Sequence, residues 1–264
     1  TMEVTDAASY EEEIRAMAKE GYDLILTTFS PMTEATKAVA ADYPDVKFAA
    51  IFQNINVDGE TYANVWDTEY RGEECTYVTG AIAATLSESG VLGYIGVCEA
   101  ASGFMQGALS VNPDVDVKFM SVNSYEDPAK AKEIANAMIA EGVDAIQTDA
   151  GNSQIGVIEA ANEAGIYVSG DVSDNSALCP NGFYAYMGID FGENVYQAIK
   201  YFVEDSFPGG EYGYMNSASG TYYVDLTLLD ALAEALPEKA ETIAAAEKQA
   251  EEIIAKAQAQ ADSQ

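Results

Sequence analysis

The sequence contains no histidine. Ser-His-Asp and Cys-His catalysis and all histidine-ligated metal sites are therefore excluded. Only three cysteines are present, Cys75, Cys98 and Cys179, and they are far apart, with no CxxC pair that would indicate a zinc or redox motif. We interpret them as small buried hydrophobic residues. An enzyme built from this chain would have to use carboxylates, tyrosine, lysine or a cofactor.

Basic residues are also scarce, because 12 Lys and Arg stand against 44 Asp and Glu and leave a formal net charge of −32. Such a field repels phosphate backbones and anionic lipid head groups, so we expect no nucleic-acid partner and no binding to a membrane surface. No hydrophobic run approaches the roughly 18 residues of a membrane span, and no segment resembles a signal peptide. These features predict a soluble chain, or one whose leader has been removed.

What the sequence does contain is an alternation of helices and strands over most of its 264 residues. Continuous apolar runs such as YDLILTT (22–28), KFAAIF (47–52) and VLGYIGV (91–97) are typical of buried parallel strands, and amphipathic segments separate them. This pattern predicts an α/β fold with parallel sheets covered by helices. Because no Gly/Ser-rich or Pro-rich linker interrupts it, we expect two lobes joined by several short crossings.

Ligands of open α/β sheets bind beyond the carboxyl ends of the strands. Phe29 and Asp149 each follow such a run, so both are candidate ligand contacts. Trp66 and Asp67 follow the third unit and offer a stacking face, with packing between the lobes as the alternative. Neither a Walker loop nor a GxGxxG motif follows a strand, so a nucleotide-phosphate enzyme is disfavoured. We expect no cofactor and no metal.

Several segments resemble the basic-membrane-protein family in order and spacing over most of the chain, among them EGYDLILTTFSP, GAIAATLSESGVLGYIGV, EGVDAIQTDAGNSQIGVIEAANEAGIYV and VYQAIKYFVEDSFPGG. This family comprises substrate-binding lipoproteins of bacterial ABC transporters, including purine-nucleoside receptors. The resemblance implies a type I periplasmic-binding-protein fold, with two Rossmann-like lobes and a hinge. It also implies an extracytoplasmic location, a lipid anchor on an N-terminal cysteine outside this chain, and delivery of ligand to an ABC permease.

By this resemblance, residues 1–101 and about 190–207 form the N-terminal lobe, and residues 102–189 and about 221–264 form the C-terminal lobe. The family begins with a βα unit that has no counterpart here. Residues 2–5 resemble its second strand instead. The first βα unit is therefore expected to be missing from the sheet of the N-terminal lobe.

The ligand contacts of the family transfer only in part. Nucleoside receptors of this family carry a stacking aromatic residue where this chain has Gln147, whereas Gly151 and Asn152 match a turn with a Gly pair. The ribose-binding Asp of the family corresponds to Asp171 or Asp174 after a shift of one residue. From the residues alone, Asp149, Asp171 and Asp174 bind sugar hydroxyls or a cation, or else cap the helices that follow them.

We therefore predict a non-enzymatic solute receptor of an ABC transporter. It captures a small polar ligand, and a purine nucleoside is the favoured identity of that ligand. Hinge closure around the ligand would be the signal to the permease, and we expect a monomer. Three alternatives stay open. They are another polar metabolite as ligand, a sensor with the same fold, and a hydrolase built on two carboxylates.

Overall fold

The chain is described from a computed structural model that covers residues 4, 6–97, 100–215 and 220–261. Two compact units are distinct. Unit 1 contains residues 1–70 and 190–215, and unit 2 contains residues 71–189 and 216–264, so the chain passes between the units three times. Residues 71–101, expected in the N-terminal lobe, belong to unit 2 because their strand pairs within its sheet. The strand expected at residues 2–5 lies outside the described residues except for Val4.

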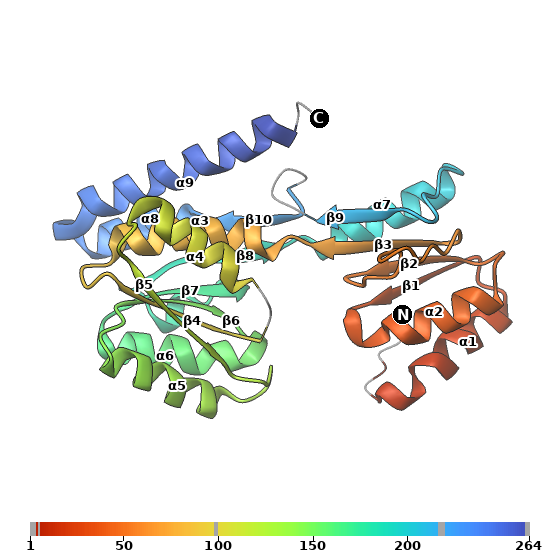
Figure 1. Ribbon diagram of the computed structural model, residues 1–264, viewed down its shortest axis with the longest axis horizontal. Helices are drawn as coiled ribbons and strands as arrows, with labels where there is room; N and C mark the ends of the chain where they lie inside the picture. The colour runs from red at the N-terminus through yellow and green to blue at the C-terminus, as the bar shows by residue number, and fades with distance from the viewer. Residues whose placement is uncertain (1–3, 5, 98–99, 216–219, 262–264) are drawn as a thin grey trace. The chain divides into compact units, whose positions relative to one another are not determined.

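Unit 1 is built on a parallel four-stranded sheet in the order β1-β2-β3-β9. Its strands are β1 (Leu24–Thr28), β2 (Lys47–Ile51), β3 (Val65–Tyr70) and β9 (Tyr212–Met215). The helices of this unit are α1 (Tyr10–Glu20), α2 (Thr33–Asp42) and α7 (Phe191–Val203), with the short 3-10 turns η1 (Ala7–Ser9) and η2 (Ser30–Met32). Figure 1 shows α1 and α2 beside this sheet.

Alternate residues of β2 face opposite sides of the sheet, as the pleat of a strand requires. Phe48 and Ala50 are buried in one apolar cluster with residues of α1 and α2, such as Ile14 and Val39. Ala49 faces the other side, where it joins Trp66 of β3 and Ala198 of α7. The three helices therefore cover both faces, and the continuous apolar run at residues 47–52 is explained.

Unit 2 is built on a six-stranded sheet in the order β10-β8-β7-β6-β4-β5, parallel except for the antiparallel edge strand β10. Its strands are β4 (Val91–Gly96), β5 (Asp116–Ser121), β6 (Ala145–Asp149), β7 (Tyr167–Val172), β8 (Phe183–Ile189) and β10 (Tyr222–Asp225). Its helices are α3 (Gly72–Leu86), α4 (Ala101–Val111), α5 (Pro128–Ala140), α6 (Gln154–Ala164), α8 (Thr227–Ala235) and α9 (Ala240–Ala261). Three 3-10 turns complete it, η3 (Gly151–Ser153), η4 (Ser176–Leu178) and η5 (Pro237–Lys239).

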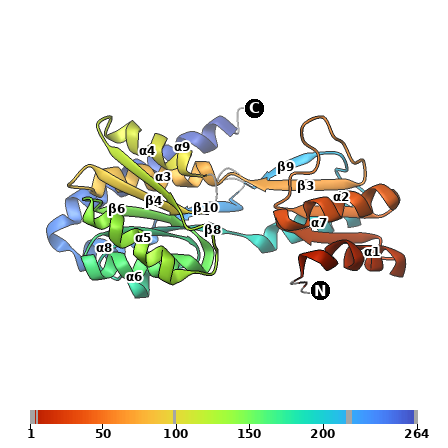
Figure 2. The same cartoon turned by 60° about the horizontal axis from the view of Figure 1, so that its bottom comes forward.

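The two faces of the unit 2 sheet carry different helices (Figure 2). On one face, Ile146 of β6 and Val168 of β7 pack with Ala135 of α5 and Val157 of α6. On the other face, α3 is buried along most of its length and α4 and α9 pack against it. A continuous helical cover on both faces leaves the carboxyl edge of the parallel strands as the place where loop residues gather.

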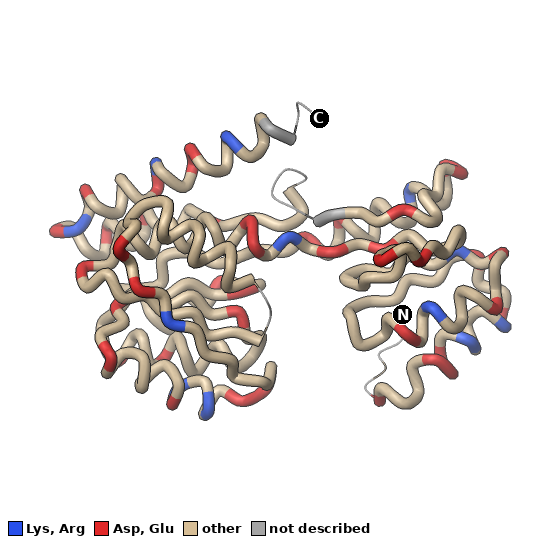
Figure 3. The backbone as a smooth tube through the Cα atoms, viewed as in Figure 1, with Lys and Arg blue, Asp and Glu red and all other residues tan. Residues whose placement is uncertain are grey.

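Acidic residues are spread along the helices of each unit and outnumber the basic ones (Figure 3), in keeping with the net charge of −32. No helix in the described part of the chain is long and apolar enough to cross a membrane.

Candidate functional site

Four aromatic residues gather at the carboxyl edge of the unit 1 sheet. Phe29 follows β1, Phe52 follows β2, Tyr70 ends β3, and Phe191 begins α7. We call these residues the aromatic cluster. The rings of Phe29 and Phe52 stack with centroids 5.5 Å apart, and the ring of Phe191 meets them edge-on at 6.0 and 5.2 Å. Tyr70 packs edge-on against Phe52 at 5.0 Å.

Two residues of the aromatic cluster have a strained backbone, and two of its rings are exposed. Phe29 and Phe52 have φ angles of 70° and 59°, in a region that non-glycine residues seldom occupy. Phe52 is only 6% exposed and forms the base, whereas Phe29 is 52% and Phe191 37% exposed. Strain of this kind concentrates at ligand-binding sites. The edge thus presents a supported aromatic face on which a planar ligand could stack.

In unit 2, two carboxyl groups meet at the carboxyl edge of neighbouring strands. Gln147 of β6 pairs with Ser169 of β7, and the Ser169 hydroxyl donates to Gln147 Oε1 over 2.5 Å. Two residues further along each strand, and so on the same face, lie Asp149 and Asp171. Both are buried, and their carboxyl groups are hydrogen-bonded to each other. We call them the acid pair.

Burial, the neighbouring Asp149 carboxylate and the hydrogen bond with it raise the pKa of Asp171 well above its usual value. The backbone N–H groups of Gly151 and Val172 donate to Asp171 and oppose this rise in pKa. Tyr94 on β4 donates from its hydroxyl to Asp149 Oδ2 over 3.1 Å. The raised pKa favours the state of the acid pair in which Asp171 is protonated, and in that state the pair keeps several acceptor lone pairs.

This geometry bears on the hydrolase alternative. Glycosidases keep their two carboxyl groups about 5–10 Å apart so that the scissile bond, and in inverting enzymes a water, fits between them. The acid pair is in direct hydrogen-bond contact and leaves no such space. Among the described residues, no group of three or more Asp, Glu or Cys is arranged to hold a metal ion.

The other candidate residues in unit 2 lie near the acid pair, and their polar groups form hydrogen bonds with neighbouring residues of the same unit. Gln147 is fully buried, and its amide donates to the carbonyls of Thr148 and Gly170. Gly151, with φ of 54°, begins the turn that supplies an N–H to Asp171, and the Tyr125 ring lies over it. Asn152 is exposed, and its amide donates to the Glu126 carboxylate.

Asp174 is exposed, and its carboxylate accepts from the backbone N–H of Ser176 over 2.8 Å. This contact closes a turn of the loop before η4, whose N-cap residue is Asn175. Ligand contact by Asp174 stays a prediction.

Trp66 and Asp67 lie inside β3, not in a loop beyond a strand as the sequence predicted. Asp67 is fully buried, and its carboxylate accepts from the backbone N–H groups of Ile55 and Asn56 at 2.6 and 2.9 Å, so it organises the loop after β2. The Trp66 ring packs edge-on against Tyr201 of α7 and lines a surface hollow of about 680 Å³ with Phe207 and Tyr212. Because α7 begins at the carboxyl edge and runs back along the sheet, this hollow lies at the opposite end from Phe29.

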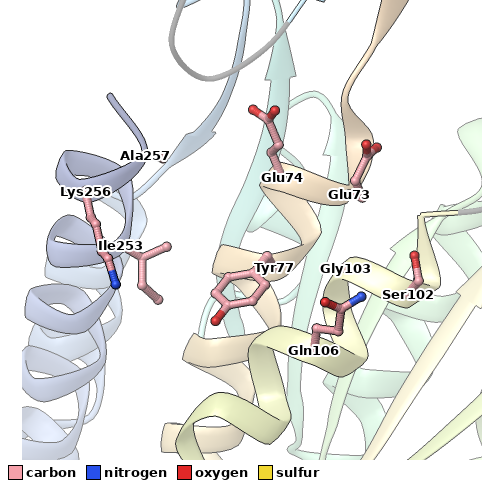
Figure 4. Close-up of a pocket in the computed structure, with 9 residues that line it drawn as sticks. All are labelled: Glu73, Glu74, Tyr77, Ser102, Gly103, Gln106, Ile253, Lys256 and Ala257. Atoms are coloured by element: carbon pink, nitrogen blue, oxygen red, sulfur yellow. The ribbon is translucent and has the colours of Figure 1, made fainter. Parts of the chain in front are cut away.

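A separate groove of about 450 Å³ lies between α3, α4 and α9 in unit 2. Ile253 and Lys256 of α9 face Tyr77 of α3 across it, and Glu73 and Glu74 lie at the start of α3 (Figure 4). The groove contains none of the candidate residues predicted from the sequence. The groove lies between helices and not at the carboxyl edge of a sheet, so we do not assign the ligand site to it.

The sequence did not predict Phe52 and Phe191 as part of the site. Phe52 appeared as the last residue of an apolar run, and neither its positive φ angle nor the stacking of its ring on Phe29 can be read from that run. Phe191 had a usable signal, because Asp190 caps α7 by accepting from the N–H of Glu193 and so marks the helix start directly after β8.

Comparison with known proteins gives the family. The model of the Bmp family, described as ABC transporter substrate-binding protein PnrA-like, matches residues 2–259. The chain belongs to the Bmp family. Substrate-binding proteins of this family are not enzymes, so the resemblance stated from the sequence is confirmed and the hydrolase alternative is set aside.

Curated relatives agree with the assignment to the Bmp family. A purine-binding protein of Brucella abortus is 36% identical over 184 residues, which are 67% of this chain and 51% of that protein. Basic membrane protein B of Borreliella burgdorferi is 29% identical over 81% of this chain and 65% of its own length. The chain thus spans between half and two thirds of the length of these relatives.

Solved structures share the fold of this Bmp-family chain. An ABC transporter solute-binding protein from Aeropyrum pernix aligns with a TM-score of 0.78 and 22% identity over 97% of this chain and 80% of that one. A transcriptional activator of the comK gene from Bacillus halodurans aligns with a TM-score of 0.73 and 21% identity, covering 89% of this chain and 84% of that one. The predicted α/β fold of the type I periplasmic-binding class is therefore confirmed.

Proposed function

We propose that this protein captures a purine nucleoside and presents it to the permease of an ABC transporter. The aromatic cluster is the observation that carries the proposal, because two half-exposed rings held by a buried third suit the face of a nucleobase. The name of the Brucella relative, a purine-binding protein, points to the same ligand class.

The acid pair supplies the polar half of the proposal. Carboxyl oxygens accept hydrogen bonds from the hydroxyls of a ribose. A proton on Asp171 would lower the negative charge of the acid pair, which suits an uncharged ligand such as a nucleoside. Contacts from both units to one ligand would favour a closed arrangement about the three chain crossings, and the permease would recognise that arrangement. In this proposal the protein acts outside the cytoplasm as a lipid-anchored monomer.

The test is titration calorimetry of the protein with inosine, guanosine and adenosine, together with the variant Phe29→Ala. We expect saturable binding without turnover and about tenfold weaker binding by the variant, because stacking of a base on an aromatic side chain contributes about 1–3 kcal/mol. Tyr22→Ala is the matched control. Its ring is 50% exposed, close to the 52% of Phe29, but Tyr22 precedes β1 whereas Phe29 follows it, so the two residues lie at opposite ends of the strand. Absence of binding to all three nucleosides, or equal losses for both variants, would contradict the proposal.

A further inference from the structure

Asn194 lies on α7, one turn after Phe191 of the aromatic cluster. It follows Phe191 by three residues and precedes Ala198 by four, so the three side chains share one face of the helix. Phe191 contacts Phe29 and Phe52, and Ala198 is buried against the sheet beside Ala49 and Trp66. The Asn194 side chain therefore lies on the face of α7 that carries both a ring of the aromatic cluster and a residue buried against the sheet.

The amide of Asn194 is buried without being satisfied. The residue is 4% exposed, and its Nδ2 atom has no hydrogen-bond partner in the part of the chain that the structure describes. A buried donor without a partner destabilises a folded protein, so it is seldom kept for folding alone. Asn64 in the same unit shows the ordinary case, because its buried Nδ2 donates to the carbonyls of Ala40, Tyr43 and Val46, each at 3.0 Å.

We infer that Asn194 is a specificity-determining residue that donates a hydrogen bond to an acceptor atom on the edge of a heteroaromatic ring stacked on the aromatic cluster. This inference rests on the proposed function and extends it to the chemistry of the ring. The ring must carry a carbonyl oxygen or an unprotonated ring nitrogen, and a purely hydrocarbon aromatic ring would leave the amide unpaired. The inference requires the half-exposed Phe191 ring to turn aside so that the ligand reaches the buried amide.

The experiment compares inosine binding by the wild type, Asn194→Leu and Asn64→Leu in titration calorimetry, with urea unfolding of each protein measured in parallel. Leucine is close to asparagine in shape but has no donor. We expect Asn194→Leu to bind inosine about tenfold more weakly, the effect of one lost hydrogen bond, while its urea midpoint is unchanged or higher. Asn64→Leu should lower the urea midpoint and leave inosine affinity unchanged at temperatures where it is folded.

The outcomes separate the two proposals. Wild-type affinity in Asn194→Leu overturns the role of Asn194 while the proposed function stands. If the leucine variant does not fold, Asn194→Ala is measured in its place, and wild-type affinity in that variant overturns the inference equally. A wild type that binds no nucleoside contradicts the proposed function itself.

Discussion

At the scale of single residues, the acid pair is the least ordinary feature of unit 2. Two carboxyl groups on the same face of adjacent strands repel each other when both are ionised. Here burial and the proximity of Asp149 raise the pKa of Asp171, which favours a proton on Asp171 and so relieves this repulsion. A strongly perturbed carboxyl pair of this kind is more typical of a functional site than of a structural one.

This pairing makes the stability of the protein depend on pH. The folded chain holds the Asp171 proton more tightly than the unfolded chain does, so above the unfolded pKa of about 3.9 the folded state binds more protons and stability falls as pH rises through the raised folded pKa. Asp171→Asn has no such proton to lose. We expect its stability relative to the wild type to increase between pH 4 and pH 8, by about 1.4 kcal/mol for each unit by which the pKa is raised.

Urea unfolding at several pH values in this range measures the effect. Asp174→Asn serves as the control, because Asp174 is exposed and lies only three residues away. Parallel stability curves for the wild type and Asp171→Asn would contradict the shared proton.

Some residues of the candidate site could be predicted from the sequence, whereas their contacts with one another could not. Phe29 and Asp149 were predicted because each ends a buried parallel strand, and the carboxyl edge is where such folds bind ligands. The partnership of Asp149 with Asp171 depends on the register of β6 against β7, and the exposure of Phe191 depends on how α7 packs. Neither the register of a sheet nor the packing of a helix is encoded in local spacing.

At the scale of elements, the sequence did not predict strand β3, and it placed residues 71–101 in the N-terminal lobe although they belong to unit 2. Both differences arise from contacts that local sequence patterns do not show. The segment VWDTEY has three consecutive polar residues at its centre, so it does not read as an apolar run. Asp67 can be buried there because its carboxylate accepts three hydrogen bonds. Residues 72–96 read correctly as a helix and a strand. Their membership of unit 2 is set by long-range pairing of β4 with β5 and β6, which no local pattern reveals.

The α3–α4 contact offers a prediction at this scale. Gly103 and Gly107 lie one turn apart on α4, and a Cβ atom on Gly107 would stand 1.9 Å from the carbonyl oxygen of Tyr77 on α3. The helix backbones must therefore separate to admit a methyl group. We expect Gly107→Ala to lower the free energy of unfolding by about 3 kcal/mol, as overpacked cores do.

Thermal or urea unfolding measures this loss. Met105→Ala on the same helix is the control, because Met105 is exposed and its truncation should change stability by no more than about 0.5 kcal/mol. A Gly107→Ala protein as stable as the wild type would show that the two helices are not in close contact.

At the scale of the whole molecule, the chain crosses between the two units three times, and the proposed function requires these crossings to act as a hinge. Closure about such a hinge would change quantities that can be measured. A ligand that contacts both units stabilises the folded protein in proportion to its occupancy, by about 2.7 kcal/mol at a free concentration 100 times Kd. If closure accompanies binding, the radius of gyration in small-angle X-ray scattering should decrease at that concentration while the melting temperature rises. Phe29→Ala at the same inosine concentration should show smaller changes in both, because its occupancy is lower. A higher melting temperature with an unchanged radius of gyration would mean that the ligand binds one unit alone, and would contradict hinge closure while leaving binding intact.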